Sequence, residues 1–317
     1  MSALIDLVET RDGETSTGPR GAALVWLVAT VLFIVFVATG HYENHYGTDP
    51  LTNAAQARAF ADDQHWTLEE LEGFAAPRFQ GNVAWFEEGV DGPTSKYPPG
   101  AAVWAAPLYL LDTSLEQTSF LDPDDPSEQI EVPTPSTYVP ATVAASLSVA
   151  VALGFGGLTL LPLLPARGVL LAMVTGGLGT GAWSVASDRL WQHGPAMMCI
   201  SIGTYFASKE RFVAAGLAFG AGILVRPHTA VVGAMIGLVV AGNRRSVGPA
   251  LAIGATSFVG VVLLVLYNHA VFGDLSVSGG YSSGFADRVV DSSPLLLVQR
   301  MGEMFVHFRV GLSLIHI

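Results

Sequence analysis

The sequence predicts an all-α protein: a polytopic bundle of transmembrane helices with a long first extracytoplasmic loop that contains short interfacial helices. Half of the 317 residues are hydrophobic and only 13% are charged, whereas soluble domains carry about 25% charged residues. The apolar residues form long runs, and residues 22–40 contain no charged side chain. As a helix, such a run crosses the hydrocarbon core and satisfies its own backbone hydrogen bonds.

Seven membrane spans are predicted from the apolar runs. They cover residues 22–40, 138–163, 168–187, 195–208, 211–225, 228–242 and 248–267. The first run is too long for the apolar region of a signal peptide, and its flank is acidic as well as basic, so we expect it to persist as a span. The run 100–111 has only a dozen residues and is expected to form a re-entrant or interfacial helix.

The basic residues predict the orientation, because cytoplasmic loops are enriched in lysine and arginine. If residues 100–111 do not cross, the loops on one side contain Arg20, Arg167, Lys209, Arg211, Arg244 and Arg245. That side is therefore predicted to be cytoplasmic. The chain then divides into three parts. These are a cytoplasmic tail (1–21), a transmembrane domain (22–267) that includes the outer loop (41–137), and an outer segment that leads into a further span (268–312). We expect a plasma-membrane protein with its functional face outside.

The outer loop is expected to begin with short interfacial helices and to continue as an acidic, irregular segment. Apolar side chains suited to the membrane boundary are Phe60, Trp66, Leu68, Leu71, Phe74, Trp85 and Phe86. Prolines and acids in residues 112–137 favour an irregular loop. The net charge of −12 argues against nucleic-acid partners, and the single cysteine, Cys199, excludes an intramolecular disulfide.

Asp49 follows the first span and has two compatible interpretations. An aspartate before Pro50 is typical of a helix start, where the carboxylate caps the first turn. A carboxylate at the lipid–water boundary could also act as a general base. Nearby, His41 and His45 have the spacing that would let two imidazoles hold a divalent metal on one helix face. The alternative is that their segment only anchors the chain at the interface.

Lys96 is the only lysine on the predicted outer side, and it precedes the stiff turn of residues 98–100. An ammonium group at this depth would neutralise a lipid phosphate as a point charge. The simpler interpretation is a lysine whose stem lies along an interfacial helix while its amine reaches water.

Two further outer turns carry polar residues close to the bilayer, a position that often marks a functional site. Arg189 and His193 lie in the turn of residues 188–194, and Arg226 and His228 interrupt a later apolar run. Arg189, His193 and His228 are candidates for a substrate pocket. Alternatively, Arg189 faces water and Arg226 only terminates a helix.

In this order, the segments resemble the lipid-phosphate-dependent glycosyltransferases of the GT-C fold, in particular the branch of protein O-mannosyltransferase-like and aminoarabinose-transferase-like enzymes. The resemblance covers residues 22–308 and rests on Asp49, SKYPPGAAVWAAPLYL, LWQHGPA, GLAFGAGILVRPHTAVV and YNHAVFGDLSVSGGYSSG. KYPPG is the most specific of these motifs, and the order of the set carries more weight than any one of them.

The resemblance implies an inverting transfer of a sugar from a polyprenyl- or dolichyl-phosphate donor at the extracytoplasmic face. It implies that Asp49 is the catalytic base and that Lys96, Tyr97 and Arg226 bind the donor phosphate. The paired acids of the mannosyltransferases are absent, because Pro50 follows Asp49. The acceptor class and any need for a divalent metal therefore stay open.

A multi-span transporter or lipid flippase is the alternative function, and a membrane scaffold is a third. Charged residues are scarce inside the predicted spans, whereas ion-coupled transporters usually retain some at mid-depth, and no inverted repeat is evident. The chain is short for the fold that it resembles, and residues 313–317 look like sequencing-adapter read-through. We therefore expect a C-terminally truncated fragment with a non-native tail.

Overall fold

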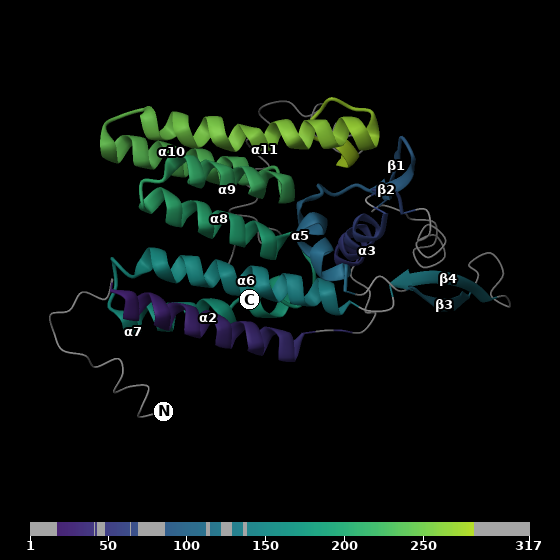
Figure 1. Cartoon of the computed structure of the whole chain (residues 1–317), viewed down its shortest axis with the longest axis horizontal. Helices are drawn as coiled ribbons and strands as arrows, with labels where there is room; N and C mark the ends of the chain where they lie inside the picture. Colours follow the sequence, from purple (N-terminus) through teal and green to yellow (C-terminus); the bar gives the residue numbers. More distant parts are fainter. Residues whose placement is uncertain are drawn as a thin grey trace, which may run out of the picture.

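The computed structural model describes residues 18–40, 42, 48–63, 65–68, 86–111, 115–121, 129–135 and 138–281. Within these ranges most residues are helical, as the sequence predicts. Seven of the helices run side by side as a bundle (Figure 1): α2 (Pro19–Thr39), α6 (Val139–Leu160), α7 (Ala166–Leu178), α8 (His193–Ser208), α9 (Phe212–Val225), α10 (Thr229–Arg244) and α11 (Gly248–Phe272).

Three helices of the described chain are long and apolar enough to cross a membrane. They are α2, α6 and α11, with 21, 22 and 25 residues. The helices at the other four predicted spans are shorter, with 13 to 16 residues in α7, α8, α9 and α10. The fold is thus mostly helical with three candidate membrane-crossing helices, and the arrangement of seven spans stays a prediction.

The bundle is held together by close contacts between helices with small residues. Helix α9 packs against α8 and α11, and α6 packs against α2 and α8. The closest approach joins α9 to α11, where a Cβ added to Gly260 would lie only 2.1 Å from the carbonyl oxygen of Gly220. Small residues let two helix backbones approach in this way, and the contact fixes the direction in which α9 reaches its C-terminal end.

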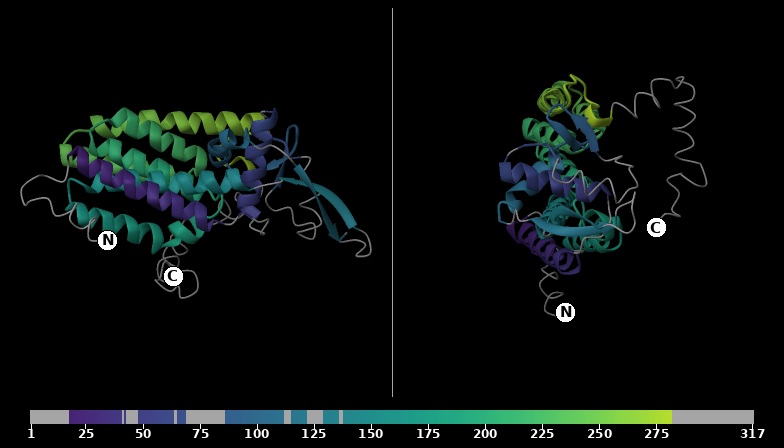
Figure 2. Two further views of the ribbon diagram at one scale, coloured as in Figure 1. Left: turned by 60° about the horizontal axis from the view of Figure 1, so that its bottom comes forward. Right: turned by 90° about the vertical axis from the view of Figure 1, so that its right-hand side faces the viewer.

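The remaining elements gather at one end of the bundle (Figures 1 and 2). They are α3 (Thr48–Asp63), α5 (Gly100–Tyr109), β1 (Phe86–Gly89), β2 (Gly92–Ser95), β3 (Leu115–Leu121) and β4 (Gln129–Pro135). Helix α5 has 10 residues, which makes it about 15 Å long and too short to cross the bilayer core. It packs on α3 through a buried cluster that includes Ala54, Ala57 and Tyr109.

The all-α prediction is wrong for the outer segment, which contains two antiparallel strand pairs. β1 pairs with β2, and β3 pairs with β4 inside the region predicted to be irregular. Opposite positions include Thr118 with Val132 and Phe120 with Ile130, and these residue types are favoured in strands. Each strand of a two-stranded sheet is an edge strand, so the prolines of β4 are tolerated there.

Two helix ends also differ from the prediction. Helix α7 stops at Leu178, where the backbone N–H of Gly179 donates to the carbonyl of Thr175, and a short π-helical turn, η1 (Ala182–Ala186), follows. A cluster of glycines at this point lowers helix stability. Helix α11 continues to Phe272, five residues past the predicted end at 267, and terminates at Gly273 in the left-handed conformation (φ 72°).

Some of the residues expected at the membrane boundary have a different environment. Phe60 stacks on Trp66 with 4.6 Å between ring centroids, and Leu68 is buried. Trp66 also meets Tyr267 of α11 edge-on, with 5.1 Å between ring centroids, so these side chains pack within the outer segment and against the end of the bundle. The expected contributions of Leu71, Phe74 and Trp85 lie outside the described residues, and for Phe86 only the backbone, at the start of β1, is described.

Candidate functional site

Two hydrogen bonds join side chains that are far apart in the sequence, at the end of the bundle that carries α3 and α5. The Tyr97 hydroxyl donates to Asp49 Oδ1 at 2.5 Å, and Arg226 Nη1 lies 2.7 Å from His193 Nδ1. Burial and Arg226 lower the pKa of His193, whereas the negative charge of Asp49 raises it, so the two pairs interact electrostatically. We call Asp49, Lys96, Tyr97, His193 and Arg226 the polar cluster.

Asp49 is positioned by α3 and by its hydrogen bond to Tyr97. The helix begins at Thr48, so Asp49 lies inside the first turn, not before it as a capping residue would. A carboxylate in the first turn interacts favourably with the helix dipole. Tyr97 is only 5% exposed, so its hydroxyl holds the Asp49 carboxylate where solvent competes little.

The segment KYPPG brings Lys96 and Tyr97 to the C-terminal end of α9. A Cβ added to Gly100 would lie 2.6 Å from the backbone nitrogen of Val225, and Arg226 is the next residue. Only a glycine permits this approach of α5 to α9. The Lys96 amine lies 5.3 Å from the centre of the Tyr97 ring. The two cations therefore lie on segments in direct backbone contact.

The contact between Arg226 and His193 fixes the protonation of the imidazole. A guanidinium has no acceptor, so Arg226 is the donor and His193 Nδ1 carries the lone pair. Burial lowers the pKa of His193 from 6.5, and the positive charge of Arg226 lowers it further, while Asp49 raises it and His228 lowers it. His193 is consequently a neutral acceptor near pH 7, with its proton on Nε2.

Each of the other two substrate-pocket candidates has a charged neighbour. His228 immediately precedes α10, and burial and then the Arg226 charge lower its pKa. Arg189 forms an ion pair with Asp188 at 3.6 Å. The same turn is fixed to α3 by a hydrogen bond of 2.9 Å from the Asn53 amide to the Leu190 carbonyl, and Asn53 lies one helical turn after the catalytic candidate.

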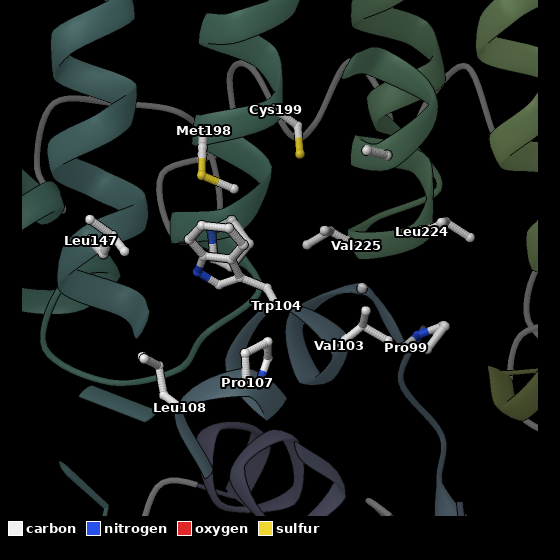
Figure 3. Close-up of a pocket in the computed structure, with 13 residues that line it drawn as sticks. Pro99, Val103, Trp104, Pro107, Leu108, Leu147, Met198, Cys199, Leu224 and Val225 are labelled. Carbon is white, nitrogen blue, oxygen red and sulfur yellow. The ribbon is translucent and has the colours of Figure 1, made fainter. Parts of the chain in front are cut away.

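An apolar pocket of about 460 Å³ lies between α5, α6, α8 and α9. It is lined by Pro99, Gly100, Val103, Trp104, Pro107, Leu108, Leu147, Pro195, Met198, Cys199, Ala221, Leu224 and Val225. In Figure 3 the Trp104 indole lies in the middle of the lining side chains, with Leu108 and Leu147 on one side and Leu224 and Val225 on the other. None of the lining side chains is charged, so the pocket suits a hydrocarbon chain.

The pocket adjoins the polar cluster along three backbone segments. Pro99 follows Lys96 by three residues, Pro195 follows His193 by two, and Val225 directly precedes Arg226. A molecule with an apolar tail and an anionic head could therefore place its tail among the apolar side chains of the pocket and its head near Lys96 and Arg226.

The opposite end of the bundle carries a different set of charges. Because successive helices alternate in direction, that end holds Arg20, Arg167, Lys209, Arg211, Arg244 and Arg245 (Figures 1 and 2). Arg244 is paired with Glu210, and both side chains are more than half exposed. The basic residues used to predict the orientation are thus together, and they lie away from the polar cluster.

The structure brings most of the predicted site residues together. Asp49 pairs with Tyr97, and His193 pairs with Arg226. The Lys96 amine lies 5.3 Å from the centre of the Tyr97 ring. Burial and then the Arg226 charge lower the pKa of His228, and Arg189 pairs with its neighbour Asp188. His41 and His45 lie outside the described residues, so the predicted metal pair is untested. Within the described ranges no group of three or more His, Cys, Asp or Glu side chains is arranged to hold a metal ion.

The sequence reasoning missed the pairing of Tyr97 with Asp49 and the residues that line the pocket. The resemblance implies a phosphate contact for Tyr97, whereas its hydroxyl donates to a carboxylate 48 residues away. Trp104 and Met198 are ordinary apolar residues in the sequence. The one available signal was Gly100, since a glycine at the start of a helix after two prolines indicates a close backbone contact.

Comparison of the chain with protein-family models, with curated proteins and with solved structures finds no match in any of the three.

Proposed function

We propose that this chain is a membrane glycosyltransferase that moves a sugar from a polyprenyl- or dolichyl-phosphate donor to an acceptor at the extracytoplasmic face. One observation carries the proposal: an uncharged apolar pocket opens beside a cluster that holds a carboxylate and two cations. A lipid-linked sugar phosphate has the matching sequence of parts, namely an apolar tail, an anionic phosphate and a sugar that must meet a base.

The proposed reaction is a single displacement at the anomeric carbon. The acceptor hydroxyl gives its proton to the Asp49 carboxylate while its oxygen attacks the anomeric carbon. The bond from that carbon to the phosphate oxygen breaks, and the lipid phosphate leaves with the bonding electrons, which inverts the anomeric centre. Lys96 and Arg226 bind the departing phosphate, and such stabilisation of developing charge contributes several kcal/mol to catalysis.

In this proposal the other two members of the cluster position the reacting groups. Tyr97 donates to Asp49 and holds the carboxylate toward the acceptor, in place of the phosphate contact expected from the sequence. His193 accepts from Arg226 and fixes the guanidinium. The basic residues at the far end support an extracytoplasmic site, because the positive-inside rule places that end in the cytoplasm.

Transport is the second candidate function, and the distribution of charge favours transfer over it. Helices α6, α8 and α9 contain no Asp, Glu, Lys or Arg, whereas ion-coupled transporters usually keep ionisable residues at mid-depth. The residues of the polar cluster lie at one end of the bundle. A flippase would move the donor lipid between leaflets without forming a glycosidic bond.

The test is to incubate membranes that contain the protein with radiolabelled polyprenyl-phosphate sugars and to follow the label into new products. Asp49→Asn should reduce transfer by about 10³-fold or more, because it removes the base, while membrane insertion is unchanged. Asp62→Asn is the matched control, since Asp62 is an exposed acid on the same helix. Full transfer by Asp49→Asn would exclude the base assignment, and lipid translocation without any labelled product would favour the flippase.

A further inference from the structure

The segment that follows α11 folds into a compact turn anchored on that helix. Asn268, buried in α11, donates from its amide to the Ser276 carbonyl at 2.8 Å. The Ser276 hydroxyl donates to Asp274 Oδ2 at 2.5 Å and accepts the backbone N–H of Gly279 at 3.2 Å. Residues 276–280, which we call the seat, therefore have a fixed conformation next to the helix end.

Two glycines of the seat occupy places where no other residue fits. Gly279 has a positive φ of 43°, and a Cβ there would lie 2.3 Å from Asn268 Oδ1. A Cβ on Gly280 would lie 2.5 Å from Lys96 Cα and 2.8 Å from the Lys96 carbonyl oxygen. Both of these Lys96 atoms belong to the backbone, so no side-chain rotation can relieve the clash of a Cβ at Gly280. Gly280 thus lies directly on the backbone of the site lysine, 184 residues away in the sequence (280 minus 96).

The hairpin that leads into Lys96 is attached to the same helix end. The backbone N–H of Val90, in the turn between β1 and β2, donates to the Val271 carbonyl at 2.8 Å. A Cβ on Gly89 would lie 2.9 Å from that same carbonyl oxygen. The end of α11 therefore holds the chain six residues before Lys96 through the hairpin, and at Lys96 itself through the seat.

We propose that the seat is a positioning element for Lys96, with Gly280 as the positioning residue. A lysine carries its charge on a flexible four-carbon stem, so the place that its ammonium reaches depends on where its backbone is fixed. The seat fixes that backbone against the end of α11 and so sets the position of the ammonium, which lies 5.3 Å from the centre of the Tyr97 ring. This inference deepens the proposed function and rests on it as far as the phosphate is concerned.

The first experiment measures the environment of Lys96 and requires no activity. The chain has two lysines, Lys96 and Lys209, so the modification of Lys96 by an N-hydroxysuccinimide ester can be read by mass spectrometry relative to Lys209. Gly280→Ala should raise this ratio about threefold or more, because a displaced backbone exposes the half-buried amine. Gly254→Ala, at an exposed position of α11 with open space around it, should leave the ratio unchanged. An unchanged ratio in Gly280→Ala would overturn the proposal.

A second variant covers the case in which Gly280→Ala does not fold. Asn268→Ala removes the hydrogen bond that anchors the seat but introduces no clash, and the labelling ratio should rise in it too. In whichever variant is folded, kcat/KM for a polyprenyl-phosphate sugar should fall about tenfold, since a displaced ammonium binds and stabilises the leaving phosphate less well. An unchanged kcat/KM together with a raised labelling ratio would contradict the link between the seat and the phosphate.

Protection of Lys96 from labelling by a bound lipid phosphate, measured in the wild-type protein, distinguishes the two proposals. Polyprenyl phosphate should lower the labelling of Lys96 relative to Lys209 if the ammonium binds phosphate. If the lipid gives no protection, the proposed function fails, whereas the response of the ratio to Gly280→Ala still decides whether the seat positions Lys96.

Discussion

The two ends of the helical bundle both carry charged side chains, but they hold them in different ways. At the end with α3 and α5, side chains from four separate segments are paired by short hydrogen bonds beside an apolar pocket. At the other end, arginines and a lysine lie in the terminal turns of the helices and on the short connections between them, and the Arg244–Glu210 pair is open to solvent. Exposed pairs of this kind contribute little to stability.

Charged residues occur at both ends of the bundle. The candidate site differs in that side chains from separate segments of the chain meet there. The basic end satisfies the positive-inside pattern without requiring any of its residues to meet. The polar cluster depends on tight contacts such as that of Gly100 with α9. Function is therefore expected to be sensitive to substitution at one end and tolerant at the other.

Between equivalent residues of the two ends, the largest difference is expected for the two lysines. Lys96→Gln should reduce kcat/KM for the lipid-phosphate sugar by about 100-fold, because it removes one of the two cations that we propose bind the leaving phosphate. Lys209→Gln should change kcat/KM by less than about twofold, since the Lys209 amine lies against the Tyr205 ring at the opposite end. Initial rates in detergent with matched protein amounts measure both. Comparable losses in the two variants would break the contrast between the ends.

A smaller effect is expected from the hydrogen bond that holds Asp49, the proposed base. Tyr97→Phe removes the hydroxyl at 2.5 Å from Asp49 and should lower kcat about tenfold with little change in the donor KM, because the carboxylate loses a buried partner that orients it. Tyr205→Phe, toward the basic end, is the control with the same chemical change. A rise in KM with unchanged kcat would return Tyr97 to the phosphate-binding role that the resemblance implies.

The helices were predictable because their signal is local. The apolar runs place α2, α6 and α11 within a few residues of the observed ends, and a run of uncharged residues has few ways other than a helix to satisfy its backbone in lipid. The outer segment was predicted less well. Whether β3 and β4 form depends on pairing between residues as far apart as Leu115 and Pro135, and such pairing is not visible in the composition of a proline-rich loop.

The site was predictable as a set of residues but not as a set of contacts. Asp49, Lys96 and Arg226 stood out because charged residues are rare near apolar runs. The direction of each side chain depends on tertiary packing, so the partner of Tyr97 and the place of Gly280 could not be derived from spacing. A glycine in SGGY predicts a turn, whereas its contact with a lysine backbone requires the folded chain.

The smallest expected effect is a dependence on pH that belongs to the site end alone. The pKa of His193 is lowered from 6.5 by burial and then by Arg226, against an opposing effect of Asp49. The folded protein therefore binds fewer protons at this residue than the unfolded chain as the pH falls below 6.5, so acidification in that window opposes the folded arrangement. Protonation of Nδ1 also removes the acceptor and places a positive charge against the Arg226 guanidinium.

We expect the donor KM to rise about threefold between about pH 7.5 and about pH 5.5. The rise should be weaker in His193→Gln, whose amide oxygen accepts at any pH. His65→Gln, outside the polar cluster, should follow the wild type. If His193→Gln and the wild type respond to pH alike, the Arg226–His193 contact does not control donor binding.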